Sequence, residues 1–364
     1  SHFLIHPRLA ELAQQQHTTD GDEALNAAAT EMVRISHSLA QPADILPYRV
    51  HLETLATAAE HRELEIAKTL FSESGHYQSK FAEYERARNS LAKALTFIEK
   101  VSGLENSEYT ECLNNLGSVL HNLENFEGAK KCFEQAILMD QKILGKDDPA
   151  VATGHNNLGQ VLLDMNNPDG AILHLEKAVE INAKQLGPDH PYVASGYYNL
   201  GIVLHAIGDL PRAKSLLERV LAVRKKILGD SHPDVAQSHH SLGMALQTIG
   251  NLHDAKMHYE QAVSVWEAAL GPDSLETAAA ITSLAGMLHV TGDLSGAKAH
   301  YEQALRVFEA ALPPENENIR DVQLQLELLK QGLTYPQLLQ KMEAGEDLPD
   351  DLLDLLDDLF GDSD

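Results

Sequence analysis

Residues 157–187 read NLGQVLLDMNNPDGAILHLEKAVEINAKQLG, and residues 199–229 follow the same pattern as NLGIVLHAIGDLPRAKSLLERVLAVRKKILG. The two stretches start 42 residues apart. Their opening Leu-Gly pair occurs four times at this spacing, followed by a Leu-Ala variant: Leu116-Gly117, Leu158-Gly159, Leu200-Gly201, Leu242-Gly243 and Leu284-Ala285. A fixed period of this length predicts a solenoid, whose units contact only their neighbours and together present a long surface to a partner.

Each copy of the repeat contains two stripes of apolar residues at helical spacing. In the second copy the stripes include Leu158 and Leu175, and the stretch NNPDG at residues 166–170 separates them. Each copy is therefore expected to form two antiparallel helices. Glycines at 208, 250 and 292 are expected to end the first helices in the left-handed conformation.

These residues resemble the tetratricopeptide repeat, and the 42-residue period resembles its kinesin-light-chain variety. The resemblance covers roughly residues 107–312, and a more divergent copy precedes it at Gly75, Ala87, Leu91, Ala94 and Gly103. It implies an all-α fold, an α-α superhelix or solenoid with helical caps. The expected divisions are an N-terminal helical segment or cap (1–61), six hairpins (62–312), C-terminal capping helices (313–344) and an acidic, apolar tail (345–364).

The amino-acid composition argues against several classes of function. The formal net charge of -26 includes ten acidic and no basic residues from Glu343 to Asp364. Nucleic-acid binding is not expected, because phosphate contacts need clustered Lys and Arg. The chain has no apolar run long enough to span a membrane. Two cysteines, Cys112 and Cys132, are too few for a disulfide scaffold and suggest a reduced, cytoplasmic location.

The family resemblance implies that the first helix of each hairpin lines a concave, peptide-binding groove. Asparagines that hold a ligand's backbone in such grooves would be Asn115, Asn157 and Asn199, replaced later by Ser241 and Ser283. An amide both donates and accepts, so such a ladder can hold an extended peptide; alternatively, these side chains pair with neighbouring backbone. The other expected groove residues are Ser118, His121, Gln160, Asp164, Tyr198, His205, Gln237, His240, Gln247 and His289.

The five first helices, at 107–123, 149–165, 191–207, 233–249 and 275–291, contain no Lys or Arg. Kinesin light chains use basic groove residues for acidic cargo, so this groove is expected to prefer neutral or basic protein or peptide partners.

The groove histidines could bind metal, sense pH or simply form hydrogen bonds, and the last is favoured. Metal ligands must converge, whereas equivalent side chains on successive hairpins stand about 10 Å apart. His155 and His239 occupy positions that the repeat usually fills with large apolar residues, so they are expected to pack between helices. No motif for catalysis or cofactor binding is found, and an enzyme is not expected.

The N-terminal stretch IHPRLAE at residues 5–11 resembles a segment that precedes the repeat sensors of STAND-type signalling ATPases. Together with a start at Ser1, it suggests that the chain is the ligand-sensing part of a longer signalling protein. The alternatives are a simple helical cap, with helices expected at 22–39 and 48–59, and a free-standing cargo or scaffold adaptor of kinesin-light-chain type.

The C-terminal tail alternates acidic with large apolar residues. The apolar ones share one face of a possible helix: Leu352, Leu355, Leu356, Leu359 and Phe360. This face suggests a short interaction motif that docks on a partner or on the protein's own solenoid. The alternative is a tail that only increases solubility.

Overall fold

A computed structural model describes residues 19–38, 48–344, 348–349, 352–353 and 356. The described residues are all helical or in connections between helices, and consecutive helices pack in pairs. The expected all-α solenoid is confirmed. The chain divides into two compact units, residues 1–188 (unit 1) and 189–364 (unit 2), which are described separately.

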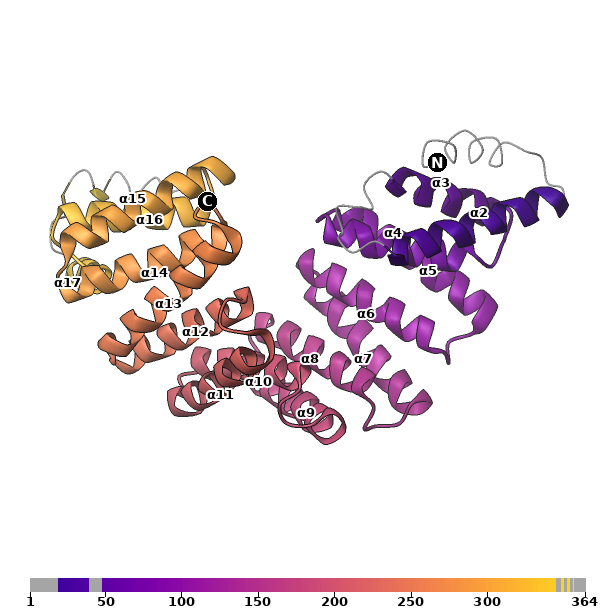
Figure 1. Cartoon of the computed structure of the whole chain (residues 1–364), viewed down its shortest axis with the longest axis horizontal. Helices are drawn as coiled ribbons and strands as arrows, with labels where there is room; N and C mark the ends of the chain where they lie inside the picture. The colour runs from indigo at the N-terminus through magenta and orange to yellow at the C-terminus, as the bar shows by residue number, and fades with distance from the viewer. Residues whose placement is uncertain (1–18, 39–47, 345–347, 350–351, 354–355, 357–364) are drawn as a thin grey trace. The chain divides into compact units, whose positions relative to one another are not determined.

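Unit 1 contains two leading helices and three helical hairpins (Figure 1). The leading helices, α2 (Thr19–Ser38) and α3 (Arg49–His61), lie where helices were expected at 22–39 and 48–59. The hairpins are α4 (Ala67–Lys80) with α5 (Tyr84–Ser102), α6 (Ser107–Asn122) with α7 (Phe126–Ile143), and α8 (Pro149–Asp164) with α9 (Pro168–Leu186). The STAND-like stretch at 5–11 lies outside the described residues.

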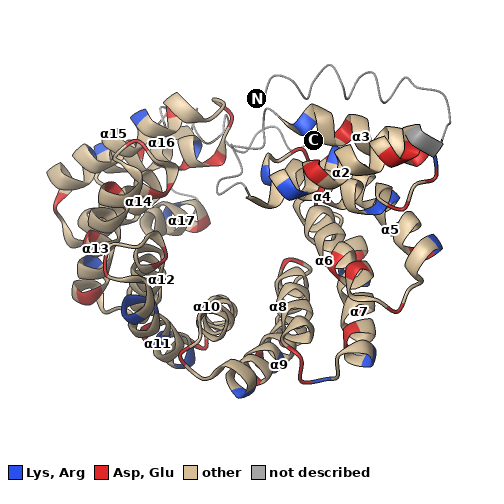
Figure 2. Ribbon diagram, turned by 45° about the vertical axis from the view of Figure 1, so that its right-hand side comes forward, with Lys and Arg blue, Asp and Glu red and all other residues tan. Residues whose placement is uncertain are grey.

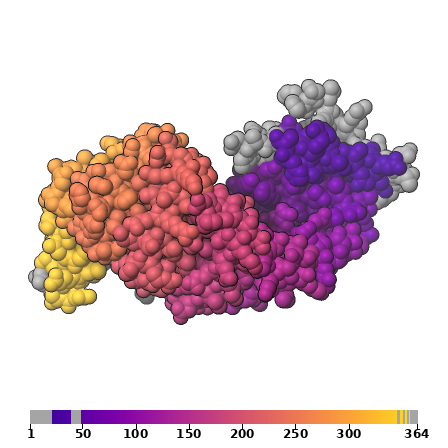
Figure 3. All heavy atoms as spheres, turned by 60° about the horizontal axis from the view of Figure 1, so that its bottom comes forward, coloured from indigo at the N-terminus to yellow at the C-terminus, as the bar shows by residue number. Residues whose placement is uncertain are grey.

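Unit 2 contains three more hairpins and two further helices. The hairpins are α10 (Pro191–Ala206) with α11 (Leu210–Leu228), α12 (Pro233–Ile249) with α13 (Leu252–Leu270), and α14 (Leu275–Thr291) with α15 (Leu294–Ala311). Helices α16 (Glu317–Lys330) and α17 (Tyr335–Ala344) follow, and α16 packs against both α14 and α15. Within this unit, Figure 3 shows the atoms of successive hairpins as adjoining bands in chain order.

Polar caps begin the second helices at a constant repeat position. The cap is Asn or Asp in five hairpins, and its side chain accepts a hydrogen bond from a backbone N–H in the first turn, as Asn125 does from Gly128 at 3.0 Å. The residue immediately before this cap is left-handed throughout: Ala82, Glu124, Asn166, Gly208, Gly250 and Gly292. The expectation for the three glycines is confirmed, and three other residues adopt the same conformation.

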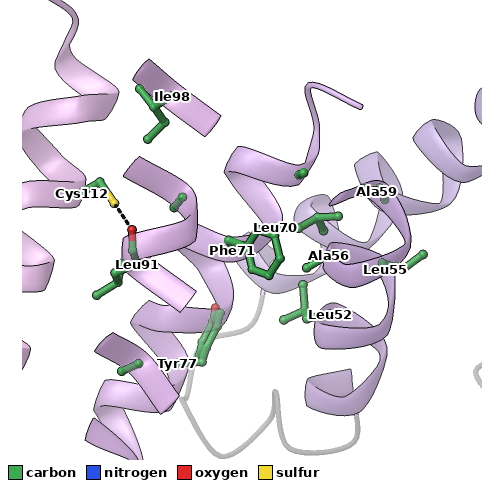
Figure 4. Packing of buried hydrophobic residues seen from close by; sticks show 14 of the residues in the cluster. Leu52, Leu55, Ala56, Ala59, Leu70, Phe71, Tyr77, Leu91, Ile98 and Cys112 are labelled. Carbon is green, nitrogen blue, oxygen red and sulfur yellow. Dashed lines mark hydrogen bonds between the residues drawn. The ribbon is translucent and has the colours of Figure 1, made fainter. Parts of the chain in front are cut away.

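The Leu-Gly glycine allows the two helices of a hairpin to pack closely. A Cβ atom on Gly159 would lie 2.7 Å from Cγ of Leu175, and one on Gly117 would lie 2.7 Å from the Phe133 ring. In unit 1 the resulting core continues into the leading helices, where Leu52 and Leu55 meet Leu70 (Figure 4). The period therefore reflects a close contact that recurs in each hairpin.

Candidate functional site

The first helices carry the polar residues that were expected to line a groove. In α6, α8, α10, α12 and α14 no residue is Lys or Arg, and α10 has no formally charged residue at all, as its uniform tan colour in Figure 2 shows. Exposed Lys and Arg side chains lie mostly on the second helices, such as Lys131 and Lys177. The surface of these five helices, called here the first-helix face, therefore lacks the Lys and Arg side chains that the second helices carry.

Hydrogen bonds connect these first helices within each unit. Each joins residues 43 positions apart, from one hairpin to the next: His121 with Asp164 (2.5 Å), Tyr198 with Ser241 (3.0 Å), His205 with Thr248 (3.0 Å), and His240 with Ser283 (2.9 Å). The two serines thus pair with a neighbouring hairpin. These bonds hold the rotamers of the first-helix side chains before any ligand binds.

The remaining expected groove residues differ in whether their side chains form hydrogen bonds within the protein. Ser118 donates to the carbonyl of Asn114 in its own helix, and Gln237 accepts from Arg224. In contrast, Asn115 and Asn157 are half-buried and Gln160 is exposed, and none of the three side chains makes a hydrogen bond with the described residues. Asn199 is half-buried and has an interaction partner.

A pocket of about 410 Å³ lies in unit 1, lined from α2, α4, α5 and α6. It includes Asn115 and carries both signs of charge. Lys68 pairs with Glu108 at 2.9 Å, and Glu73 accepts from His37 at 2.8 Å. Lys68 and His37 therefore each have an acidic partner, and Glu111 is a further acidic residue of the lining.

A second pocket, of about 470 Å³, lies in unit 2 and is called here the unit 2 pocket. It contains four of the expected groove residues: His205, Gln247, Ser283 and His289. No Lys or Arg lines it, and its acidic residue is Asp321. Burial lowers the pKa of His289, whose ring hydrogen-bonds the backbone of Leu333, so this histidine is neutral at pH 7.

Sequence reasoning missed a cation beside the first helices, because it belongs to a second helix. Arg224 of α11 is 8% exposed and stacks on the Tyr198 ring, 4.7 Å from its centroid. It donates to the carbonyl of Asp234, to Gln237 and to Ser238 at 2.9–3.2 Å. The Nη1 group of Arg224 thus donates inside unit 2, where it joins α11 to α12.

His155 and His239 are buried between helices, as expected. Each contacts a histidine of the second helix, with Nδ1 to Nδ1 distances of 2.8 Å to His174 and His258 respectively. One nitrogen must donate and the other accept, so the two rings of a pair cannot both be protonated. Burial, with the neighbouring histidine, lowers the pKa of His155 and of His239 to about 4.

Other chemical groups in the described part of the chain do not form a reactive centre. Burial raises the pKa of Cys112 to about 12 and of Cys132 to about 11, which keeps both as thiols at pH 7. Among the described residues, no three His, Cys, Asp or Glu side chains are placed to hold a metal ion. None of the described helices has the length and apolar character that a membrane crossing requires.

Part of the tail contacts the C-terminal helices. Leu352 is fully buried with Leu324, Leu328 and Leu338 of α16 and α17, and Leu356 packs at the edge of this cluster. Leu355, Leu359 and Phe360 lie outside the described residues.

Comparison with known proteins identifies the repeat. Residues 109–184, 171–226, 192–264 and 234–310 match the model of the tetratricopeptide repeat, which together covers more than half of the 364 residues. No catalytic domain is matched, and no curated protein matches the sequence.

Several solved structures are similar to this chain at low sequence identity. BtubC (BKLC) from P. vanneervenii has a TM-score of 0.52 and 20% identity, covering 70% of this chain and 94% of that chain. The apo form of RapI has a TM-score of 0.52 and 13% identity, covering 76% and 97%. A Podosopora anserina putative kinesin light chain has a TM-score of 0.49 and 22% identity, covering 55% and 94%.

Proposed function

The chain belongs to the tetratricopeptide repeat family, whose members are generally protein-binding scaffolds, and we propose that it binds a protein or peptide partner through its first-helix face. The unit 2 pocket carries this proposal, because exposed apolar side chains stand there beside fixed polar ones. Met244 and Val290 are 40% and 51% exposed, and both line the pocket with His205 and Gln247. An apolar, partly pre-formed recess with oriented polar groups is the usual form of a binding site.

A pair of methionines in one hairpin offers a matched test. Met244 of α12 lines the pocket, whereas Met257 of α13 is similarly exposed (48%) and does not line it. Met244→Arg should abolish capture of partners in affinity purification, and Met257→Arg should retain them. Equal retention of every partner by both variants would rule out the first-helix face as the binding surface.

The partner's chemistry should be neutral or basic rather than acidic. An acidic peptide would find no Lys or Arg on the first helices α6, α8, α10, α12 and α14, and Arg224 is buried with its Nη1 group donating within unit 2. Desolvating an acidic side chain without a compensating cation is unfavourable.

The wider role that we propose is ligand sensing in a larger cytoplasmic signalling protein of the STAND ATPase type. The short IHPRLAE stretch at residues 5–11 supports it. A phosphate-binding loop encoded upstream in the gene is the expected observation. A heptad-repeat coiled coil there would instead favour a cargo or scaffold adaptor, which the 42-residue period supports.

A further inference from the structure

Two tyrosines at equivalent positions of successive hairpins differ in their hydrogen bonding. Tyr259 of α13 and Tyr301 of α15 are both 1% exposed and both line the unit 2 pocket. The Tyr259 hydroxyl donates to Oε1 of Gln247 at 2.8 Å. The residue 42 positions after Gln247 is His289, whose ring bonds the backbone of Leu333 instead. The Tyr301 hydroxyl consequently has no hydrogen-bond partner among the described residues.

The space above this hydroxyl is open because a side chain is missing from α14. Gly286 stands 42 positions after Met244, and a Cβ atom there would lie 3.5 Å from the Tyr301 hydroxyl oxygen. A side chain as long as methionine at this position would fill the recess. The glycine therefore leaves the phenol facing the pocket, where a ligand can reach it.

The charge of the pocket comes from a carboxylate near this phenol. Asp321 of α16 forms no ion pair within the described chain, and no Lys or Arg lines the pocket. Burial raises the pKa of Asp321, and burial together with the Asp321 charge raises that of Tyr301. Asp321 is exposed as a residue, and its carboxyl group accepts a hydrogen bond from Gln325, which also lines the pocket. A negatively charged hydrogen-bond acceptor, the Asp321 carboxylate, and the unpaired Tyr301 hydroxyl thus lie in one pocket.

We propose that the unit 2 pocket receives the basic side chain, Lys or Arg, of a peptide bound along the first helices. Asp321 supplies the opposite charge, and the Tyr301 hydroxyl accepts a further N–H of the ammonium or guanidinium group. Tyr335, 41% exposed at the pocket wall, offers an aromatic surface that suits a cation. This assignment rests on the proposed peptide-binding function and specifies its ligand.

The neutral and acidic alternatives fit this pocket less well. A neutral side chain would bury Asp321 further without compensating its charge, which is unfavourable. An acidic side chain would add repulsion between like charges in a recess without a cation. A basic side chain uses both groups at once.

A peptide selection with matched variants tests the assignment. A library of displayed 12-residue peptides is selected on the wild-type protein, keeping those that fail to bind Met244→Arg. We expect Lys or Arg to be enriched at one position. In calorimetric titration, Asp321→Asn should weaken a selected peptide about tenfold or more, and Tyr301→Phe about threefold. Tyr259→Phe is the control for losing a phenol elsewhere in the pocket and should leave the affinity within about twofold.

A second arm changes the ligand instead of the protein. Replacing the enriched Arg by citrulline, or Lys by its acetylated form, should weaken wild-type binding as much as Asp321→Asn does, and should have no further effect on that variant. Thermal unfolding of each variant shows whether it is folded. Peptides that depend on Met244 but not on Asp321 or a basic residue would overturn this assignment alone. A selection without any Met244-dependent peptide would overturn the proposed function as well.

Discussion

One buried position near the end of the second helices differs between the two units. Among its occupants are Asp140 in α7 of unit 1, and Arg224 in α11 and Trp266 in α13 of unit 2. All three are nearly inaccessible to solvent. Oδ1 of Asp140 has no hydrogen-bond partner, whereas Arg224 makes three bonds and the Trp266 ring packs against that of His240.

The difference depends on what the next hairpin offers. Arg224 meets Ser238, whose hydroxyl accepts its N–H, but the residue at the equivalent position for Asp140 is Gly154, which has no side chain. The same backbone geometry therefore supports a polar side chain with three hydrogen bonds in one unit and one with an unpaired carboxylate oxygen in the other. The repeat period preserves close packing, while the polar balance of each contact depends on individual residues.

The largest expected effect comes from removing the satisfied contact. Arg224→Ala should destabilise unit 2 by about 3 kcal/mol, because it leaves a cavity beside Tyr198 and removes three hydrogen bonds. The control is Arg219→Ala, since Arg219 is more exposed and stacks on the neighbouring Tyr197 ring at 4.4 Å. This control substitution should lower the free energy of unfolding by less than about 1 kcal/mol. Urea unfolding, followed by hydrogen exchange of α10–α12 peptides, measures both, and equal losses would contradict this view of Arg224.

Acidification should also reduce the stability of unit 2, with a smaller effect for each titrating group than that of Arg224→Ala. The pKa of His239 and of His240 is lowered by burial to about 4, from an ordinary value of 6.5. Because the folded-state pKa lies below the unfolded one, stability is full above pH 6.5 and is lost as pH falls toward 4. The expected loss at pH 5 is about 2 kcal/mol per histidine.

The chain itself suggests a variant that tests this pH dependence. The positions of His239 and His258 are occupied by Leu113 and Cys132 three repeats earlier. His239→Leu combined with His258→Cys should remove part of the loss between pH 7 and pH 5. Hydrogen exchange in α12 and α13 at the two pH values is the measurement, and an unchanged pH dependence would show that His239 does not control it.

The sequence was sufficient to predict the hairpins, because period, glycine spacing and apolar stripes all depend on local geometry. It also indicated which helices carry the polar face and that His155 and His239 are buried. It could not indicate Arg224, since counting charges by helix ignores how far a long side chain on a second helix reaches. The sequence could not indicate the unpaired Tyr301 hydroxyl either. Its lack of a hydrogen bond depends on the orientation of the His289 ring, which bonds the backbone of Leu333, and its access to the pocket depends on Gly286.

The unsatisfied contact in unit 1 gives a smaller effect of opposite sign. Burial raises the pKa of Asp140 above its ordinary value of 3.8. Its charged form therefore opposes folding, and wild-type stability falls as pH rises through the folded-state pKa. Asp140→Asn should stabilise unit 1 by about 1 kcal/mol at pH 7 and give no gain near pH 3, where the native carboxyl is protonated in both states. Denaturant unfolding at both pH values measures this difference, and a gain that persisted at pH 3 would assign it to another cause.

The turns between paired helices give the smallest expected effect and a reciprocal test of the same contrast. The left-handed position is Gly208, Gly250 and Gly292 in unit 2, but Glu124 at φ 58° and Asn166 at φ 56° in unit 1. Glycine adopts this conformation without steric cost, asparagine tolerates it, and glutamate is strained there. Gly208→Ala should therefore destabilise unit 2 by about 1 kcal/mol.

The opposite substitution should stabilise unit 1, by a smaller free energy than Gly208→Ala costs in unit 2. Glu124→Gly should stabilise it by about 0.5 kcal/mol, because relief of strain is partly offset by the greater flexibility of the unfolded chain. Asn166→Gly, the matched control in the next hairpin, should change stability little. Local hydrogen exchange in α6–α9 reports both. If Glu124→Gly destabilised its turn as Gly208→Ala does, then side-chain contacts rather than backbone conformation would determine the residue at this position of the repeat.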